Sequence, residues 1–231
     1  CALVNLDRAG FDVSCYAPDV QQAAAVEHIS GEPLPESRNA LRESARMARG
    51  DIRPLSELKD GDYDAVVFPG GFGAALTLCS FGSDGADCTV NPEVRRLVEK
   101  AHADGKPIAA MCIAPVILAR CIPGVTVTIG NDRGTASAIE AMGGVHVDCS
   151  SREAVCDTEN RVVTTPAYMI ASGPAEVFTG AERMVEELNL GELRERFRDR
   201  LLNQDDEPHV GGNKQVGVRG RSPFGAWGYN P

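Results

Sequence analysis

The stretch Pro107-Ile-Ala-Ala-Met-Cys112 is followed at once by Ile113-Ala-Pro-Val-Ile-Leu-Ala119. The first part is typical of a buried strand, and Pro115 marks the first turn of a helix that begins directly after it. We therefore expect a strained turn that presents Cys112 at the carboxyl end of the sheet. Free amides at a helix N-terminus favour the thiolate, the nucleophilic form of cysteine. This is the arrangement of a nucleophile elbow, and the alternative is a buried structural cysteine.

Strand and helix patterns alternate through the rest of the chain. Strands are predicted at residues 11–17, 63–68, 125–129 and 145–147, and a hairpin at residues 154–157 and 161–164. Helices are predicted at residues 36–49, 92–102, 136–142 and 175–188, the second of them capped by Asn91. Apolar strand runs separated by helices predict an α/β fold with a mainly parallel sheet. Such folds place their functional sites at the carboxyl ends of the strands.

Composition narrows the class of protein. The chain has 231 residues and a formal net charge of -10, which argues against nucleic acid or an anionic membrane as a partner. The longest apolar run, residues 108–119, is too short to span a bilayer. The eight cysteines include no CxxC pair and no zinc-type spacing, so no metal site is expected. Cys15, Cys79, Cys88 and Cys121 lie in apolar segments, where burial raises a thiol pKa.

Two regions are predicted. Residues 1–190 form one α/β domain, and residues 191–231 begin with a charged helical stretch at 192–202. From Asp205 onward the composition is rich in Gly, Pro and polar residues, which predicts a disordered tail. The chain opens on Cys1 inside an apolar stretch, which predicts an N-terminal fragment in which no targeting segment can be read.

The loop Pro69-Gly-Gly-Phe-Gly73 follows a predicted strand. It fits neither a dinucleotide-binding fingerprint nor a Walker A motif, because the third glycine and the GK[ST] sequence are missing. Two interpretations stay open: its amides hold an oxyanion beside a nucleophile, or the loop is a tight turn.

The four histidines are His28, His102, His146 and His209. His146, at a short strand, can face the site or simply pack, and none of the four adjoins Cys112. A Cys–His dyad therefore finds no support in the local sequence.

Two motifs, Met111-Cys-Ile-Ala-Pro115 and Phe68-Pro-Gly-Gly-Phe-Gly-Ala-Ala75, resemble the PfpI and Parkinson-associated deglycase superfamily. Within it, the chain is similar to the branch of the ElbB glyoxalase and its vertebrate mitochondrial relatives. Further matches in the same order lie at residues 16–19, 37–39, 52–55, 88–90, 105–107, 128–130 and 163–169. The resemblance extends over about residues 1–188.

The resemblance implies a flavodoxin-like sandwich of the class I glutamine amidotransferase type, with Cys112 at the elbow and helices on both faces of the sheet. It also implies a first strand followed by a glutamate that shuttles protons, and the 231 residues contain neither. Ile113 stands where peptidase-like relatives have histidine, which disfavours a protease triad. Residues 165–168 lack the late His-x-Glu of amidotransferases, which disfavours ammonia transfer.

The sequence leaves two functions open. The first is a glyoxalase without cofactor or metal, acting on a small aldehyde through Cys112, with the amides of Gly71, Phe72 and Ile113 holding the oxyanion. Gly70, His146 and Tyr168 would line this site. The second is a thiol-based redox sensor or binding protein of the same fold. A homodimer in the cytoplasm or the mitochondrion is expected, with neither a nucleic-acid nor a membrane partner.

Overall fold

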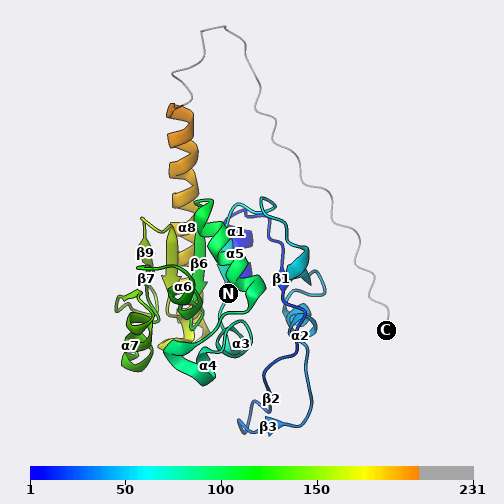
Figure 1. Cartoon of the computed structure of the whole chain (residues 1–231). Coiled ribbons are helices and arrows are strands. Elements are labelled where there is room, and N and C mark those ends of the chain that lie inside the picture. The colour runs from blue at the N-terminus through cyan, green and yellow to red at the C-terminus, as the bar shows by residue number, and fades with distance from the viewer. Residues whose placement is uncertain (203–231) are drawn as a thin grey trace.

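The computed structural model describes the backbone of residues 1–202 and the side chains of residues 1–189 (Figure 1). The helices are α1 (Ala2–Arg8), α2 (Ala40–Met47), α3 (Phe72–Leu76), α4 (Phe81–Asp84), α5 (Pro92–Ala103), α6 (Pro115–Cys121), α7 (Arg133–Ala141) and α8 (Pro174–Leu202). The strands are β1 (Tyr16–Ala17), β2 (Ala25–Val26), β3 (Pro33–Leu34), β4 (Arg53–Pro54), β5 (Val66–Phe68), β6 (Ile108–Met111), β7 (Thr126–Val127), β8 (Val145–His146), β9 (Val155–Asp157) and β10 (Val162–Thr165). Three 3₁₀ turns are η1 (Leu55–Glu57), η2 (Gly85–Asp87) and η3 (Ala167–Met169).

The central sheet has the strand order β5-β6-β10-β9. The first three strands are parallel, with Phe68 opposite Ala110 and Met111 opposite Thr165, so that β5, β6 and β10 end at one edge of the sheet. The strand β9 runs antiparallel to β10, as the predicted hairpin requires. The predicted α/β class with a mainly parallel sheet is confirmed.

Two short parallel pairs accompany the central sheet. The pair β1–β4 lies on the β5 side, and the pair β7–β8 contacts β9 and β10. Within residues 1–202, no strand pairs with the edge of β5 that faces away from β6. The prediction that a first strand is missing from this chain stays a prediction.

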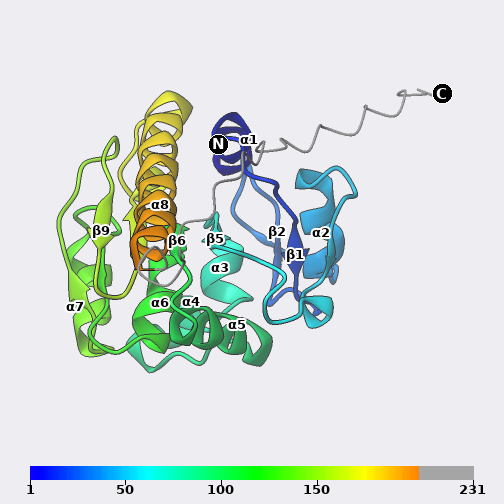
Figure 2. The same ribbon diagram turned by 90° about the horizontal axis from the view of Figure 1, so that it is seen from above.

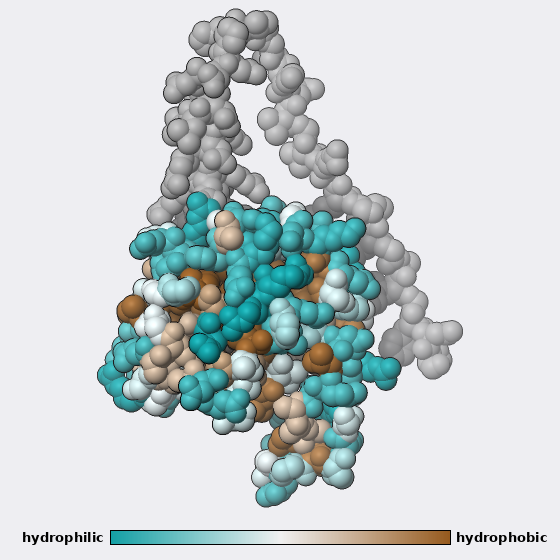
Figure 3. All heavy atoms as spheres, viewed as in Figure 1, coloured by the Kyte–Doolittle hydropathy of each residue, from teal (hydrophilic) through white to brown (hydrophobic). Residues whose placement is uncertain are grey.

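The strand β6 separates two apolar layers. Ile108 and Ala110 point into one buried cluster with α5 and α6, whereas Ala109 and Met111 point into a second cluster with α1 and α8. Figure 2 shows α1 and α8 on one side of this strand and α5 and α6 on the other. All four residues of β6 are buried, as expected for a parallel strand covered on both faces. On the face shown in Figure 3, hydrophilic residues predominate and apolar ones are scattered among them.

Several predicted boundaries differ from the structure. The strand predicted at 11–17 is regular only at Tyr16–Ala17, and the helix predicted at 36–49 begins at Ala40, because the Asn39 side chain caps it by accepting from the Arg42 N–H. The helical stretches predicted at 175–188 and 192–202 form one continuous helix, α8, which crosses the predicted boundary at residue 190. The predicted tail from Asp205 lies outside the described residues.

The start of α5 gives a test of the helix signals. Asn91 Oδ1 accepts hydrogen bonds from the N–H groups of Glu93 (2.9 Å) and Val94 (3.4 Å), and Pro92 occupies the first helical position. We expect Asn91→Ala to lower the free energy of unfolding by about 1 kcal/mol, measured by urea denaturation. Asn91→Asp keeps the acceptor and should stay near the wild-type value, so an equal loss in both variants would contradict the capping role.

Candidate functional site

The chain turns sharply where β6 ends. Cys112 has a φ of 61°, in the left-handed region that side chains other than glycine seldom occupy. The Ala114 N–H donates to the Met111 carbonyl at 3.2 Å, and Pro115 is the first residue of α6. The predicted strained strand-to-helix turn at Cys112 is therefore present.

The surroundings hold this turn in place. The Cys112 N–H donates to the carbonyl of Thr165 at 3.0 Å, which extends the β6–β10 pairing by one residue. On the helix side, Val116, Ile117 and Leu118 are completely buried in the core cluster. Packing and hydrogen bonding on both sides of the turn thus offset the roughly 1–3 kcal/mol that such a backbone costs.

The loop after β5 contacts the elbow directly. Gly70 has a φ of 85°, and a Cβ placed on it would lie 2.6 Å from the Met111 carbonyl oxygen and 2.7 Å from Cys112 Cβ. Only glycine fits such a contact without moving the backbone. The close approach expected of this loop is therefore made to the elbow itself.

Three backbone N–H groups around the elbow have no hydrogen-bond partner among the described residues. They belong to Gly71, Phe72 and Ile113. Gly71 directly precedes α3, Phe72 begins that helix, and Ile113 follows the cysteine. Unpaired donors at the ends of adjacent strands are suited to bind a developing negative charge.

The thiol of Cys112 is free and partly buried against the cluster of α1 and α8. It makes no hydrogen bond to another described residue. Burial raises the pKa of Cys79, Cys121 and Cys149 to about 11, and it also raises that of Cys15 and Cys88. The expected shielding of Cys15, Cys79, Cys88 and Cys121 is confirmed.

The segment after β10 lies beside the elbow, because β10 is the neighbour of β6. Ala167 also has a positive φ, 46°, and the following Tyr168 is 59% exposed in η3. After each of the two neighbouring strands β6 and β10, the chain therefore turns away from the sheet at a residue with left-handed backbone angles. Tyr168 is placed at the same edge as Cys112, as a residue lining the site must be.

His146 lies elsewhere in the sheet. Its side chain is 3% exposed, its Nε2 accepts from the Ile129 N–H at 3.4 Å, and its Nδ1 is 3.7 Å from Asp148. Burial lowers the pKa of this ring, which favours the neutral form. These contacts all lie around β7 and β8, so the packing interpretation accounts for His146.

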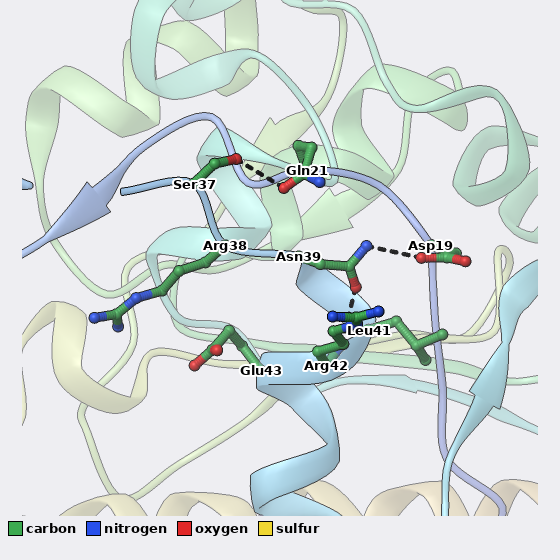
Figure 4. A pocket seen from close by; sticks show the side chains of 8 residues that line it. All are labelled: Asp19, Gln21, Ser37, Arg38, Asn39, Leu41, Arg42 and Glu43. Carbon is green, nitrogen blue, oxygen red and sulfur yellow. Dashed lines mark hydrogen bonds between the residues drawn. The ribbon is translucent and has the colours of Figure 1, made fainter. Parts of the chain in front are cut away.

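A cavity of about 430 Å³ lies at the start of α2, on the carboxyl side of β1 (Figure 4). It is lined by Asp19, Gln21, Ser37, Arg38, Asn39, Leu41, Arg42 and Glu43. Ser37 donates to Gln21 and Asn39 donates to Asp19, so that several of its polar groups satisfy one another. The sequence indicated neither the Asn39 cap nor the cavity, which depends on the pairing of residues 20–22 with 38–40.

In residues 1–189, no three His, Cys, Asp or Glu side chains gather in a way that could hold a metal ion. No helix in the described part of the chain is long and apolar enough to cross a membrane.

Comparisons with known proteins agree with this geometry. The sequence model described as the DJ-1/PfpI family matches residues 5–167. The human protein "Glutamine amidotransferase-like class 1 domain-containing protein 3, mitochondrial" is 45% identical over 80% of this chain and 73% of its own length.

Two solved structures show the same fold. The isoprenoid biosynthesis protein with amidotransferase-like domain from Ehrlichia chaffeensis is 34% identical, with a TM-score of 0.75, over 81% of this chain and 87% of that one. Glyoxalase III from Candida albicans shares the fold at 14% identity and a TM-score of 0.54, over 82% and 84% of the two chains. The expected flavodoxin-like, class I glutamine amidotransferase-like architecture is confirmed.

The contact between Gly70 and the elbow can be tested by substitution. Gly70→Ala should cost about 1–2 kcal/mol for the left-handed backbone and roughly 1–3 kcal/mol more for overlap with Met111 and Cys112. Gly124→Ala is the matched control, because Gly124 also has a positive φ but no atom within 4 Å of the added Cβ. Equal losses of unfolding free energy in the two variants would show that the Gly70 loop does not press on the elbow.

Thiol reactivity can be mapped by iodoacetamide labelling at neutral pH. We expect Cys112 to react faster than Cys79, Cys88 or Cys121, since burial keeps those three protonated. The exposed Cys1 and Cys156 should first be changed to serine, so that they do not compete for reagent. Preferential labelling of any buried cysteine in this background would contradict the assignment of Cys112.

Proposed function

Because the chain belongs to the DJ-1/PfpI family, we propose that it is a cofactor-independent glyoxalase that converts glyoxal or methylglyoxal to the hydroxy acid. The observation that carries the proposal is the left-handed Cys112 at the end of β6, together with the unpaired N–H groups of Ile113 in the elbow and of Gly71 and Phe72 in the loop that contacts it. A nucleophile and oxyanion donors at one edge of a parallel sheet suit addition to a carbonyl.

The proposed chemistry begins with attack of the Cys112 thiolate on the aldehyde carbon. A carbon–sulfur bond forms and the carbonyl oxygen becomes an oxyanion, which the backbone amides stabilise before it is protonated to a hemithioacetal. A carboxylate then moves a proton between the two carbons through an enediol, and water releases the hydroxy acid and the thiol. Methylglyoxal and one water thus give lactate without any external oxidant or reductant.

The carboxylate of this scheme comes from the resemblance, which assigns it to a glutamate after the first strand. No carboxylate contacts the Cys112 thiol within the described residues. Glu32 and Glu36 are the groups to examine if these 231 residues by themselves catalyse the reaction, whereas His146, which the sequence also suggested, bonds to Ile129 away from the elbow. The catalytic efficiency should be low, since a small aldehyde offers little binding energy beyond its reacting atoms.

We also propose a compartment and partners for the reaction. The human relative carries "mitochondrial" in its name, and we propose that compartment for this protein as well. The net charge of -10 disfavours nucleic acid as a partner. A small aldehyde is the proposed ligand, and a homodimer is the proposed assembly.

Turnover tests the proposal. The protein should convert methylglyoxal to lactate in many equivalents per protein, measured with a lactate dehydrogenase assay. Cys112→Ala should reduce the rate to that of the solution without protein, because the attacking sulfur is gone. Cys156→Ala is the matched control, since Cys156 is exposed and outside the proposed site, and it should retain activity.

The competing function, a thiol-based sensor, gives a different result in the same assay. A sensor is modified at Cys112 once and forms no lactate beyond one equivalent per protein. That outcome, with a folded protein and intact Cys112, would contradict the glyoxalase proposal.

A further inference from the structure

A second pair of cysteines lies apart from the proposed site. Cys79 precedes α4 and Cys88 follows η2, so that a segment of eight partly or fully exposed residues, 80–87, connects them. The side chains are buried, with 4% and 0% of their surface exposed, and both thiols are free. The proposed function uses neither of them.

The backbone brings the two residues together. Cys79 is opposite Val90 in an antiparallel bridge, held by the Ser80 N–H on the Thr89 carbonyl (2.9 Å) and the Asn91 N–H on the Leu78 carbonyl (2.8 Å). Cys88 precedes Val90 by two residues, so it faces the same side as Val90 and lies diagonally across from Cys79. Diagonal neighbours in an antiparallel pair are about 7–8 Å apart and their Cβ atoms are somewhat closer, so the two cysteines lie near each other on the same side of the bridge.

Each of the two thiols is near enough to influence the pKa of the other, and each also has a further contact. The Cys79 thiol is 3.2 Å from the Ala74 carbonyl of α3, to which it can donate, and the Cys88 sulfur is 3.8 Å from the Met142 sulfur. Two free, buried thiols on paired segments of the chain are candidates for a disulfide bond.

We propose that Cys79 and Cys88 form an intramolecular disulfide when the protein meets hydrogen peroxide, independently of Cys112. The antiparallel bridge that places both cysteines on one side, the burial of both thiols and their mutual influence carry this proposal. Hydrogen peroxide is small enough to enter through local opening of the 80–87 segment.

The order of attack follows from the charges near each sulfur. Arg120 Nε donates to the Cys88 carbonyl at 2.8 Å, and its positive charge lowers the pKa of the Cys88 thiol against the larger effect of burial. The Cys79 thiol also favours the Cys88 thiolate, whereas burial raises the pKa of Cys79 itself to about 11. Cys88 is therefore the sulfur that ionises first.

The reaction is balanced in atoms and electrons. The Cys88 thiolate attacks one peroxide oxygen, the O–O bond breaks, and the leaving hydroxide takes a proton to become water. The Cys79 sulfur then attacks the Cys88 sulfenic acid, the S–O bond breaks, and the leaving hydroxide takes the Cys79 proton as a second water. Two thiols are oxidised by two electrons and one peroxide is reduced to two waters.

Peptide mapping tests the pair directly. The full chain is treated with excess hydrogen peroxide under native conditions, alkylated with N-ethylmaleimide in denaturant, and digested with trypsin without reduction. Cleavage after Lys59 and Arg95 gives a peptide that contains Cys79 and Cys88 and no other cysteine. We expect this peptide to lose two hydrogens and to carry no maleimide, and to accept two maleimides after reduction.

The controls separate this pair from the other thiols. Cys112→Ser and Cys121→Ser should both form the disulfide as the wild type does, since neither residue belongs to the pair. In Cys79→Ser, a dimedone probe should trap a sulfenic acid on Cys88. Maleimide on both cysteines of the oxidised wild-type peptide, loss of the disulfide in Cys112→Ser, or a bond from Cys88 to Cys121 would overturn the proposal.

The rate of disulfide formation should also depend on pH. Both thiols are protonated at neutral pH because burial raises their pKa, so the initial rate should rise roughly tenfold per pH unit between pH 7 and pH 8. A rate that is flat over this range would contradict attack by Cys88, because it would mean that the reacting sulfur is already ionised.

Discussion

The hydrogen bond from the Cys112 N–H to the Thr165 carbonyl holds the elbow to the sheet, and most of the surrounding architecture serves to keep it there. A left-handed backbone at a cysteine is unfavourable in isolation. It persists here because β6 is paired on both edges, β5 on one and β10 on the other, while α6 is anchored in the core immediately after the turn. If β10 moved along β6 by one residue, the Cys112 N–H would lose the Thr165 carbonyl as its hydrogen-bond partner.

The position of the elbow also explains why the loop after β5 has glycine at residue 70. Gly70 has no room for a side chain because Met111 and Cys112 occupy it. With no side chain between them, the β5 loop and the elbow bring their backbone N–H groups to one place. A larger residue at Gly70 would move the following Gly71 and Phe72, so the position of their backbone N–H groups relative to the elbow depends on this one contact.

The cysteines differ in how deeply they are buried. Cys112 lies at the end of a strand and is partly accessible, whereas Cys79, Cys88 and Cys121 lie in the core, where burial favours the protonated form. Burial does not make a thiol inert toward an adjacent sulfur, because an intramolecular partner needs no access from solvent. The bridge between residues 78–80 and 89–91 provides such a partner for Cys79 and Cys88.

The sequence by itself determined the features that depend on a few adjacent residues. The Asn91-Pro92 helix start, the turn at Cys112, the glycine loop after β5 and the hairpin of β9 and β10 are local signals, and the structure contains each of them. The resemblance of Met111–Pro115 and Phe68–Ala75 was sufficient for the family and the fold. The tertiary structure decided which distant segments meet: that Gly70 presses on Cys112, that His146 bonds to Ile129 away from the elbow, and that the segment of Cys79 pairs with the segment that follows Cys88. Strand register and the packing of helices on the sheet fix those contacts, and register depends on the whole set of buried side chains, so it cannot be read from one local stretch.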